Sequence, residues 1–494
     1  MTVEQRAFCL SKLTRDSLAM GIGDTLTRLC IFIATIHLAR SLGAAGFGHY
    51  TFSLSVFIYL NMISDLGLEW TGVRRIGQLK KHNPSAIGNF VANILGLRLL
   101  LLLGAYSAFG VCLFGLARLS DIPFWPLAPF GVALLFGAVL PDWILTGLEE
   151  FRLVALSRII RWTCFVCLVM LLVRSPGDVI WASSCYTIAF GVCVLVLWTR
   201  CVPLLTSRTG GQAIDSTPWV KMLAQASSVF SYTLVHQAYF QLMTLMLGFV
   251  STDVFVGLYS AASRVPLTMI GAVSVFINVL FPTLVRLGTV DSIQPLLTLW
   301  AKGIVMVTGP FVALLAFMPR AITVSIFGAQ YEAAIPMMIW LAPTIMIMPL
   351  VILFAAATAA AGREQRLLGA VVCGAGLMLA SELSIGARWP VEGPAVSTVL
   401  ASVAALVTLM SAFEVSALVR ELLRPLAAIV VLGVLFYVLR QAVVAFLPMP
   451  GALLSTVVVA TTGTTAYLLV LRVTGCFDFR TFTRLTMSRR CETS

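Results

Sequence analysis

Long apolar runs separated by short polar breaks fill most of the chain. The runs are continuous instead of alternating with period two, and most reach the length of about 20 residues that a helix needs to cross a bilayer. The breaks contain glycine and proline, which end helices, for example at Gly43–Gly48, Asn83-Pro84, Ser175–Gly177 and Pro448–Pro450. The pattern predicts an all-α polytopic membrane protein with about fourteen transmembrane helices. Their predicted ranges are 17–39, 48–72, 86–113, 122–146, 153–173, 178–199, 222–250, 254–281, 296–318, 334–360, 366–387, 394–418, 425–447 and 451–472.

A weak internal repeat suggests how these helices are organised. The segment Phe47–Tyr50 returns as Val256–Tyr259, 209 residues later, with Gly and Tyr at the same places. Loop motifs around Gly147 and Gly362 recur in the same order at a similar offset. Parallel repeats of this kind are a transporter architecture with the substrate path between the lobes. The predicted parts are an N-lobe of six helices (1–200), a cytoplasmic linker (201–221), a C-lobe of six helices (222–418), and two further helices with a cytoplasmic tail (419–494).

Composition strengthens the membrane assignment and sets an orientation. Apolar residues make up 59% of the chain and charged residues 11%, against about 25% charged residues in a soluble domain. The net charge of +12 is explained by basic residues in alternate loops, such as Arg74, Arg75, Lys80 and Lys81, because cytoplasmic loops are rich in Lys and Arg. We therefore expect both termini in the cytoplasm and no nucleic-acid partner.

No sequence motif indicates catalysis. The chain has no soluble domain, and it lacks the P-loop and HExxH patterns. Cys164 and Cys167 lie within an apolar run without further ligands nearby, whereas a zinc site needs four. The sequence thus predicts neither an enzyme nor a metal site.

Arginines inside the predicted helices are the informative residues. A charge at the bilayer centre is costly and usually faces a partner or an aqueous cavity. Arg28, Arg98 and Arg264 lie near the middle of their helices, and Arg161 lies at a shallower depth. Because guanidinium groups bind phosphate and carboxylate in a bidentate manner, these four residues are predicted to bind an anionic substrate. Arg28 and Arg264 belong to different predicted lobes, so one anion could bridge them.

Acidic residues offer a second, structural interpretation of the same charges. Asp24 is four residues before Arg28 on one helix face and is expected to pair with it. Asp65 or Asp142 could neutralise Arg158 or Arg161 and stabilise the N-lobe, because buried pairs are often architectural. Both interpretations stay open from the sequence.

Two residues of the predicted C-lobe are candidates for ion coupling. His236 lies deep in its helix and has a side chain suited to carrying a proton, although a buried histidine is more often simply packed. Glu382 lies in the outer part of another helix. Coupling to H+ or Na+ is thus conceivable, and no other cofactor is expected.

Several segments resemble the Wzx-type polysaccharide flippases of the multidrug/oligosaccharidyl-lipid/polysaccharide exporter superfamily. The resemblance begins at Leu38–Tyr50 and continues through Asp65–Leu68 and Arg74-Arg75. Looser matches are Asp142-Trp143, Gly147–Phe151 and Ile326–Tyr331. The resemblance implies two six-helix lobes that form a V around a central cavity. In related lipid II flippases this cavity is cationic, and Arg28 and Arg264 lie where such arginines would be expected.

The same resemblance implies a function. It is the translocation of undecaprenyl-diphosphate-linked oligosaccharide repeat units across the bacterial inner membrane by alternating access. The product would be O-antigen of lipopolysaccharide or an exopolysaccharide. The implied partners are the lipid-linked glycan, the bilayer, and a polysaccharide polymerase with its chain-length regulator.

Two alternatives remain. A cation-coupled small-molecule antiporter of the same fold would favour an acidic cavity and twelve helices. An integral-membrane polysaccharide polymerase or ligase would need a long periplasmic loop with Arg or His, which the chain lacks.

Overall fold

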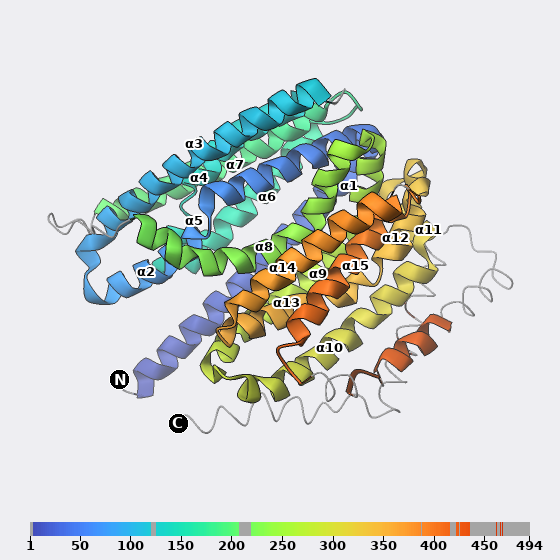
Figure 1. Cartoon of the computed structure of the whole chain (residues 1–494). Helices are drawn as coiled ribbons and strands as arrows, with labels where there is room; N and C mark the ends of the chain where they lie inside the picture. The colour runs from blue at the N-terminus through green and yellow to red at the C-terminus, as the bar shows by residue number, and fades with distance from the viewer. Residues whose placement is uncertain are drawn as a thin grey trace. The chain divides into compact units, whose positions relative to one another are not determined.

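The computed structural model describes residues 3–119, 125–206, 219–386, 388–414, 421–423 and 425–434, together with Thr461, Thr465 and Tyr467. Within these ranges every regular element is a helix (Figure 1). The predicted all-α polytopic class is therefore confirmed. The last two predicted helices lie mostly outside the described residues, so their existence stays a prediction.

The chain divides into two compact units, Met1–Val275 and Phe276–Ser494. The boundary lies within α9, so α8 and the larger part of α9, up to Val275, belong to the same unit as the N-terminal helices. The elements of the first unit are α1 (Val3–Asp65), α2 (Leu68–His82), η1 (Pro84–Ala86), α3 (Ile87–Leu119), η2 (Trp125–Leu127), α4 (Ala128–Val139), α5 (Asp142–Gly147), α6 (Phe151–Leu172), α7 (Val179–Thr206), α8 (Trp219–Val250) and the start of α9 (Asp253–Leu287).

The second unit contains the end of α9 and the helices that follow it. Helix α15 packs against α12, α13 and α14, and α10 packs against α13. The elements are α10 (Val290–Phe317), α11 (Pro319–Phe327), η3 (Ala329–Ala334), α12 (Ile335–Leu341), α13 (Thr344–Ala360), α14 (Glu364–Ser381), the π-helical turn η4 (Glu382–Gly386) and α15 (Gly393–Met410).

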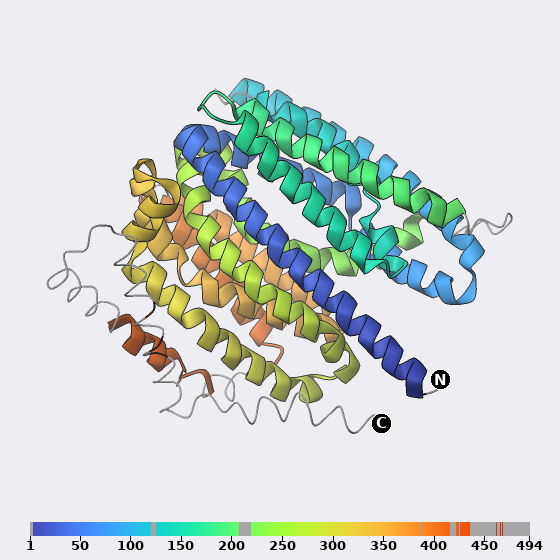
Figure 2. The ribbon, with the colours of Figure 1, turned by 180° about the vertical axis from the view of Figure 1, so that it is seen from behind.

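Helix α1 joins the first two predicted helices through a single kink. Gly43 has φ 70° and ψ 178°, a conformation open to glycine and strained for other residues, while the residues on both sides stay helical. The first arm of α1, in dark blue, is seen along its length in Figure 2. The predicted break at Gly43–Gly48 is therefore present, although only one residue of it leaves the helix.

Three predicted helices are interrupted where the sequence analysis expected continuity. The predicted helix 48–72 ends at Asp65, because Leu66 and Gly67 take left-handed φ values of 43° and 84°. The predicted helix 122–146 is divided into α4 and α5 by an extended Leu140 before Pro141. The predicted helix 334–360 is divided into α12 and α13, which are bent by 48°.

Nine described helices are long and apolar enough to span a membrane, or ten if the bent pair of α12 and α13 counts as one span. This number comes from the described residues alone and counts the two arms of α1 as one helix. The first unit places α1 against α6, α3, α4 and α7, and α6 and α4 both pack on α7 (Figure 1). A buried core joins Ile76, Ile94 and Trp143 to Met222 and Ala226 of α8.

The second arm of α1 crosses the start of α9 at the two segments that are 209 residues apart in the predicted repeat. A Cβ added to Gly48 would lie 1.9 Å from the carbonyl oxygen of Asp253, and one added to Gly257 would lie 1.9 Å from that of Ala44. Ser260 donates a hydrogen bond of 2.9 Å to the Thr51 hydroxyl. Gly48 meets Gly257, and Thr51 meets Ser260, and each of these two pairs joins residues 209 positions apart. The crossing thus brings together the two segments that carry the predicted repeat.

Candidate anion-binding site

Arg28 of α1 lies against the backbone of α9. A Cβ added to Gly271 would lie 2.0 Å from Arg28 Nη1 and 3.0 Å from Arg28 Cζ. The guanidinium therefore occupies the place that a side chain would otherwise take at this position of α9. Arg28 itself is half-buried. The sequence analysis named Arg28 but missed Gly271, whose signal was a glycine in the interior of a long helix.

Arg264 lies on the same face of α9 as Gly271, seven residues earlier. Seven residues are close to two helical turns and about 10 Å along the axis. Arg264 is half-buried, and its guanidinium interacts electrostatically with buried Tyr50 of α1. Its Nε is buried and has no hydrogen-bond partner among the described residues, which leaves a donor for a ligand. One helix face thus carries Arg264 and receives Arg28.

Arg98 is placed differently from Arg28 and Arg264. It is buried and forms an ion pair with Asp65, in which Nε donates to Oδ1 at 3.1 Å and Nη2 donates to the same oxygen. Asp65 also accepts the backbone N–H groups of Gly67 and Glu69 at 3.2 and 3.1 Å, where α2 begins. The sequence analysis placed Arg98 among the substrate-binding arginines and gave Asp65 or Asp142 as the acid that could neutralise Arg158 or Arg161. The structure pairs Arg98 with Asp65, and whether Arg98 also contacts a substrate stays a prediction.

Asp142, Arg158 and Arg161 belong to the same part of the first unit. Asp142 is 8% exposed and interacts electrostatically with Arg161 first, then with Arg158 and Arg98. The Arg161 guanidinium lies 4.9 Å from the ring centroid of Trp162 and 5.0 Å from that of Phe190, a cation–π arrangement. Asp142 therefore lies near both arginines, and its neutralisation of Arg158 or Arg161 stays a prediction. Whether Arg161 also contacts a substrate stays a prediction.

The remaining candidates are only partly described. The side chains of Asp24 in α1 and His236 in α8 lie outside the described residues, so their predicted roles stay predictions. Glu382 is 9% exposed and begins the π-helical turn η4, and such turns often mark functional sites. Its Oε2 is buried and accepts no hydrogen bond within the described part of the chain. No group of three metal-ligating side chains lies together among the residues that the structure describes.

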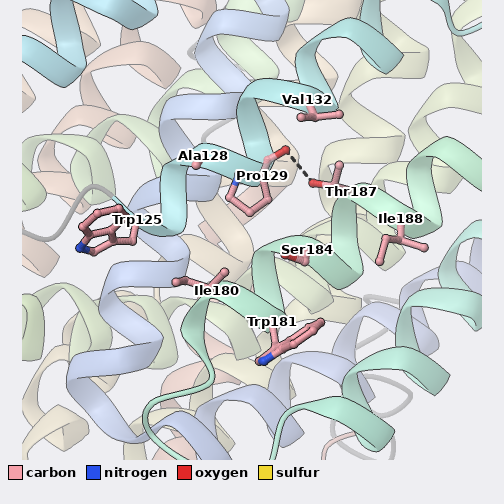
Figure 3. Close-up of a pocket in the computed structure, with 9 residues that line it drawn as sticks. All are labelled: Trp125, Ala128, Pro129, Val132, Ile180, Trp181, Ser184, Thr187 and Ile188. Atoms are coloured by element: carbon pink, nitrogen blue, oxygen red, sulfur yellow. Dashed lines mark hydrogen bonds between the residues drawn. The ribbon is translucent and has the colours of Figure 1, made fainter.

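An apolar groove in the first unit is separate from these charges. It has a volume of about 600 Å³ and is lined by η2, α4 and α7, with Trp125 and Trp181 on its rim (Figure 3). The Thr187 hydroxyl donates a hydrogen bond of 2.9 Å to the carbonyl oxygen of Pro129 inside it. Both tryptophans are more than half exposed, as expected of residues that anchor a helix end at the membrane interface.

Apolar helices of spanning length, with arginines held inside one unit, define a multi-pass α-helical membrane protein. The family model described as "Polysaccharide biosynthesis protein" matches residues 13–288. Since this match covers more than half of the chain, the protein belongs to the polysaccharide biosynthesis protein family. The family-level resemblance seen in the sequence is therefore confirmed. No curated protein matches the chain.

Solved structures with the same fold are flippases and transporters. A structure titled "Lipid II flippase MurJ, inward closed conformation" has a TM-score of 0.72 at 12% identity and covers 92% of this chain and 99% of its own. A MOP superfamily transporter from Pyrococcus furiosus has a TM-score of 0.60 at 15% identity, covering 82% and 95%. The MATE multidrug transporter DinF-BH, in complex with R6G, has a TM-score of 0.56 at 17% identity, covering 81% and 95%. At these identities the similarity establishes the fold.

Proposed function

We propose that the protein is a flippase that translocates undecaprenyl-diphosphate-linked oligosaccharide repeat units across the bacterial inner membrane by alternating access. The product would serve O-antigen or exopolysaccharide assembly. The observation that carries the proposal is the face of α9 where Arg264 and the incoming guanidinium of Arg28 lie within an apolar unit. Two half-buried guanidiniums suit a ligand with several phosphate oxygens, because Arg binds phosphate through paired N–H donors.

The family and the fold support a lipid-linked glycan as the substrate. The family is one of polysaccharide biosynthesis, and the lipid II flippase shares the fold over nearly its whole length. The anionic head group would contact Arg264 on α9 and the guanidinium of Arg28, which approaches α9 at Gly271. Positions 264 and 271 are about 10 Å apart along the helix axis. The lipid tail would stay in the bilayer. A polysaccharide polymerase and a chain-length regulator are proposed as pathway partners.

The alternatives predict different site chemistry. A multidrug transporter shares this fold, but Arg28 and Arg264 would repel the cationic ligand that a cation-coupled antiporter of this fold would favour. A polymerase or ligase would need catalytic groups in a long external loop, so we propose transport and not catalysis. We also propose that export is coupled to H+ or Na+ through Glu382 or His236. Export should then slow when the gradient of the coupling ion is collapsed.

Loss of either arginine should abolish export without loss of the folded protein. In a strain whose only flippase is this protein, Arg28→Ala or Arg264→Ala removes charge-assisted hydrogen bonds worth about 1.5–3 kcal/mol each, so affinity for the head group should fall about 10- to 100-fold. Arg→Lys should restore part of the activity, because the charge stays but the planar fork is lost. Surface glycan and detergent-extracted protein are measured together.

The matched control is Arg286→Ala, which removes an exposed arginine from the last turn of the same helix α9. This variant should export glycan normally. Normal export by a well-folded Arg28→Ala/Arg264→Ala double variant would refute the proposed site.

The proposed orientation places both termini in the cytoplasm, because reversal would expose most of the basic loops to the periplasm. Reporter fusions after Ser494 and within residues 200–220 should both report a cytoplasmic location. A periplasmic signal at either position would contradict the proposed topology.

A further inference from the structure

Gly271 lies in the interior of α9, where glycine is an unfavourable choice. Glycine is the poorest helix former after proline, and an interior glycine usually has a packing or functional reason. The three atoms nearest to a Cβ added here all belong to the guanidinium of Arg28: Nη1 at 2.0 Å, Cζ at 3.0 Å and Nε at 3.8 Å. The missing side chain therefore makes room for one group of another helix.

We propose that Gly271 is a positioning residue for substrate binding, which fixes the Arg28 guanidinium against α9 so that it can contact the anionic head group. This inference rests on the proposed function, since it assumes that Arg28 contacts the substrate. A methyl group at position 271 would force Nη1 from 2.0 Å to at least the 3.4 Å of ordinary contact. Binding groups work only when they are held within about 0.5 Å of their productive place.

The same geometry explains why the substitution should leave the fold intact. The clash of Gly271→Ala would be with the far end of a long, flexible side chain and not with backbone. Arg28 can therefore swing away, while alanine improves the helix propensity of α9. A purely structural role for Gly271 would give the opposite result, a destabilised protein.

Gly271 and Gly257, the two glycines of α9, have different surroundings. At Gly257 an added Cβ would meet the carbonyl oxygen of Ala44, which cannot move without moving α1. At Gly271 only a side chain must move. Two Gly→Ala substitutions in one helix are thus expected to affect different properties, helix packing at Gly257 and ligand affinity at Gly271.

The test measures binding of inorganic pyrophosphate to the purified full-length protein in detergent, together with its unfolding temperature. Gly271→Ala should weaken binding about 10-fold, the loss expected when one charge-assisted hydrogen bond is misplaced, and should leave the unfolding temperature equal or slightly higher. Gly104→Ala is the matched control, because a Cβ at this interior glycine of α3 would meet nothing within 4 Å. It should bind as the wild type does.

The double variant Arg28→Ala/Gly271→Ala decides whether Gly271 acts through Arg28. It should bind no more weakly than Arg28→Ala alone, because the methyl group then faces vacated space. The inference would be overturned if Gly271→Ala weakened binding as much in the Arg28→Ala background as in the wild type. It would also be overturned if Gly271→Ala bound as the wild type does while Arg28→Ala was defective. Neither result would affect the proposed site. Wild-type binding by Arg28→Ala would overturn the proposed site and the inference with it.

Discussion

Replacing Arg98 by alanine should destabilise the protein more than any other single loss of charge in the first unit. The substitution leaves the carboxylate of Asp65, whose side chain is 21% exposed, without its guanidinium. Breaking a fully buried ion pair from one side costs about 3–5 kcal/mol, and the partial exposure of Asp65 puts the expected cost at the lower end of this range. Asp65 also holds the start of α2 through the N–H groups of Gly67 and Glu69. We expect a sharply lower detergent-extracted yield and a clearly lower unfolding temperature.

Two variants make this prediction specific. Arg320→Ala removes one partner of an exposed pair, whose side chains are 72% and 50% exposed with Nη2 and Glu332 Oε1 2.8 Å apart. Exposed pairs contribute about 0–1 kcal/mol, so this control should be nearly neutral. The double variant Asp65→Asn/Arg98→Met replaces both charges and should recover much of the stability. Equal shifts for Arg98→Ala and Arg320→Ala would show that the Arg98 pair is not a structural contact.

Adding one methyl group where α1 crosses α9 should have the second large effect. Gly257→Ala would place its Cβ 1.9 Å from the carbonyl oxygen of Ala44, and Gly48→Ala would place its Cβ 1.9 Å from that of Asp253. Overpacking costs about 1–3 kcal/mol or more when neighbours cannot yield, and here the neighbours are backbone. Each variant should have a lower unfolding temperature and reduced export.

The Gly48→Ala/Gly257→Ala double variant tests whether the two glycines serve one contact. Once the first methyl group has separated the helices, the second should cost less, so the two losses should not add. Gly104→Ala again provides the control for a methyl group in open space. Unchanged stability in both single variants would contradict the close crossing.

The sequence alone determined the class of the protein and the order of its main helices. Continuous apolar runs can be satisfied only as spanning helices, since backbone groups must be hydrogen-bonded within the bilayer. It also indicated the repeat, because the spacing between Gly48 and Gly257 is a property of the chain. The interruptions within helices were harder to predict from the sequence. Gly67 is a local signal for a left-handed backbone, but the left-handed Leu66 has none, since leucine rarely takes a positive φ.

Only the tertiary structure decided which buried charges belong together. Arg28, Arg98 and Arg264 are alike in the sequence in that each is an arginine near the middle of an apolar run, although only Arg28 has an acid, Asp24, four residues before it. The arginines differ in the residues of other helices that contact them. Asp65 forms an ion pair with Arg98, whereas Gly271 leaves space for the guanidinium of Arg28. Apolar periodicity specifies which residues form helices but carries little information about which helix faces meet. Long-range contacts of single side chains therefore distinguish Arg98, which pairs with Asp65, from Arg28 and Arg264, which we propose as the ligand-binding pair.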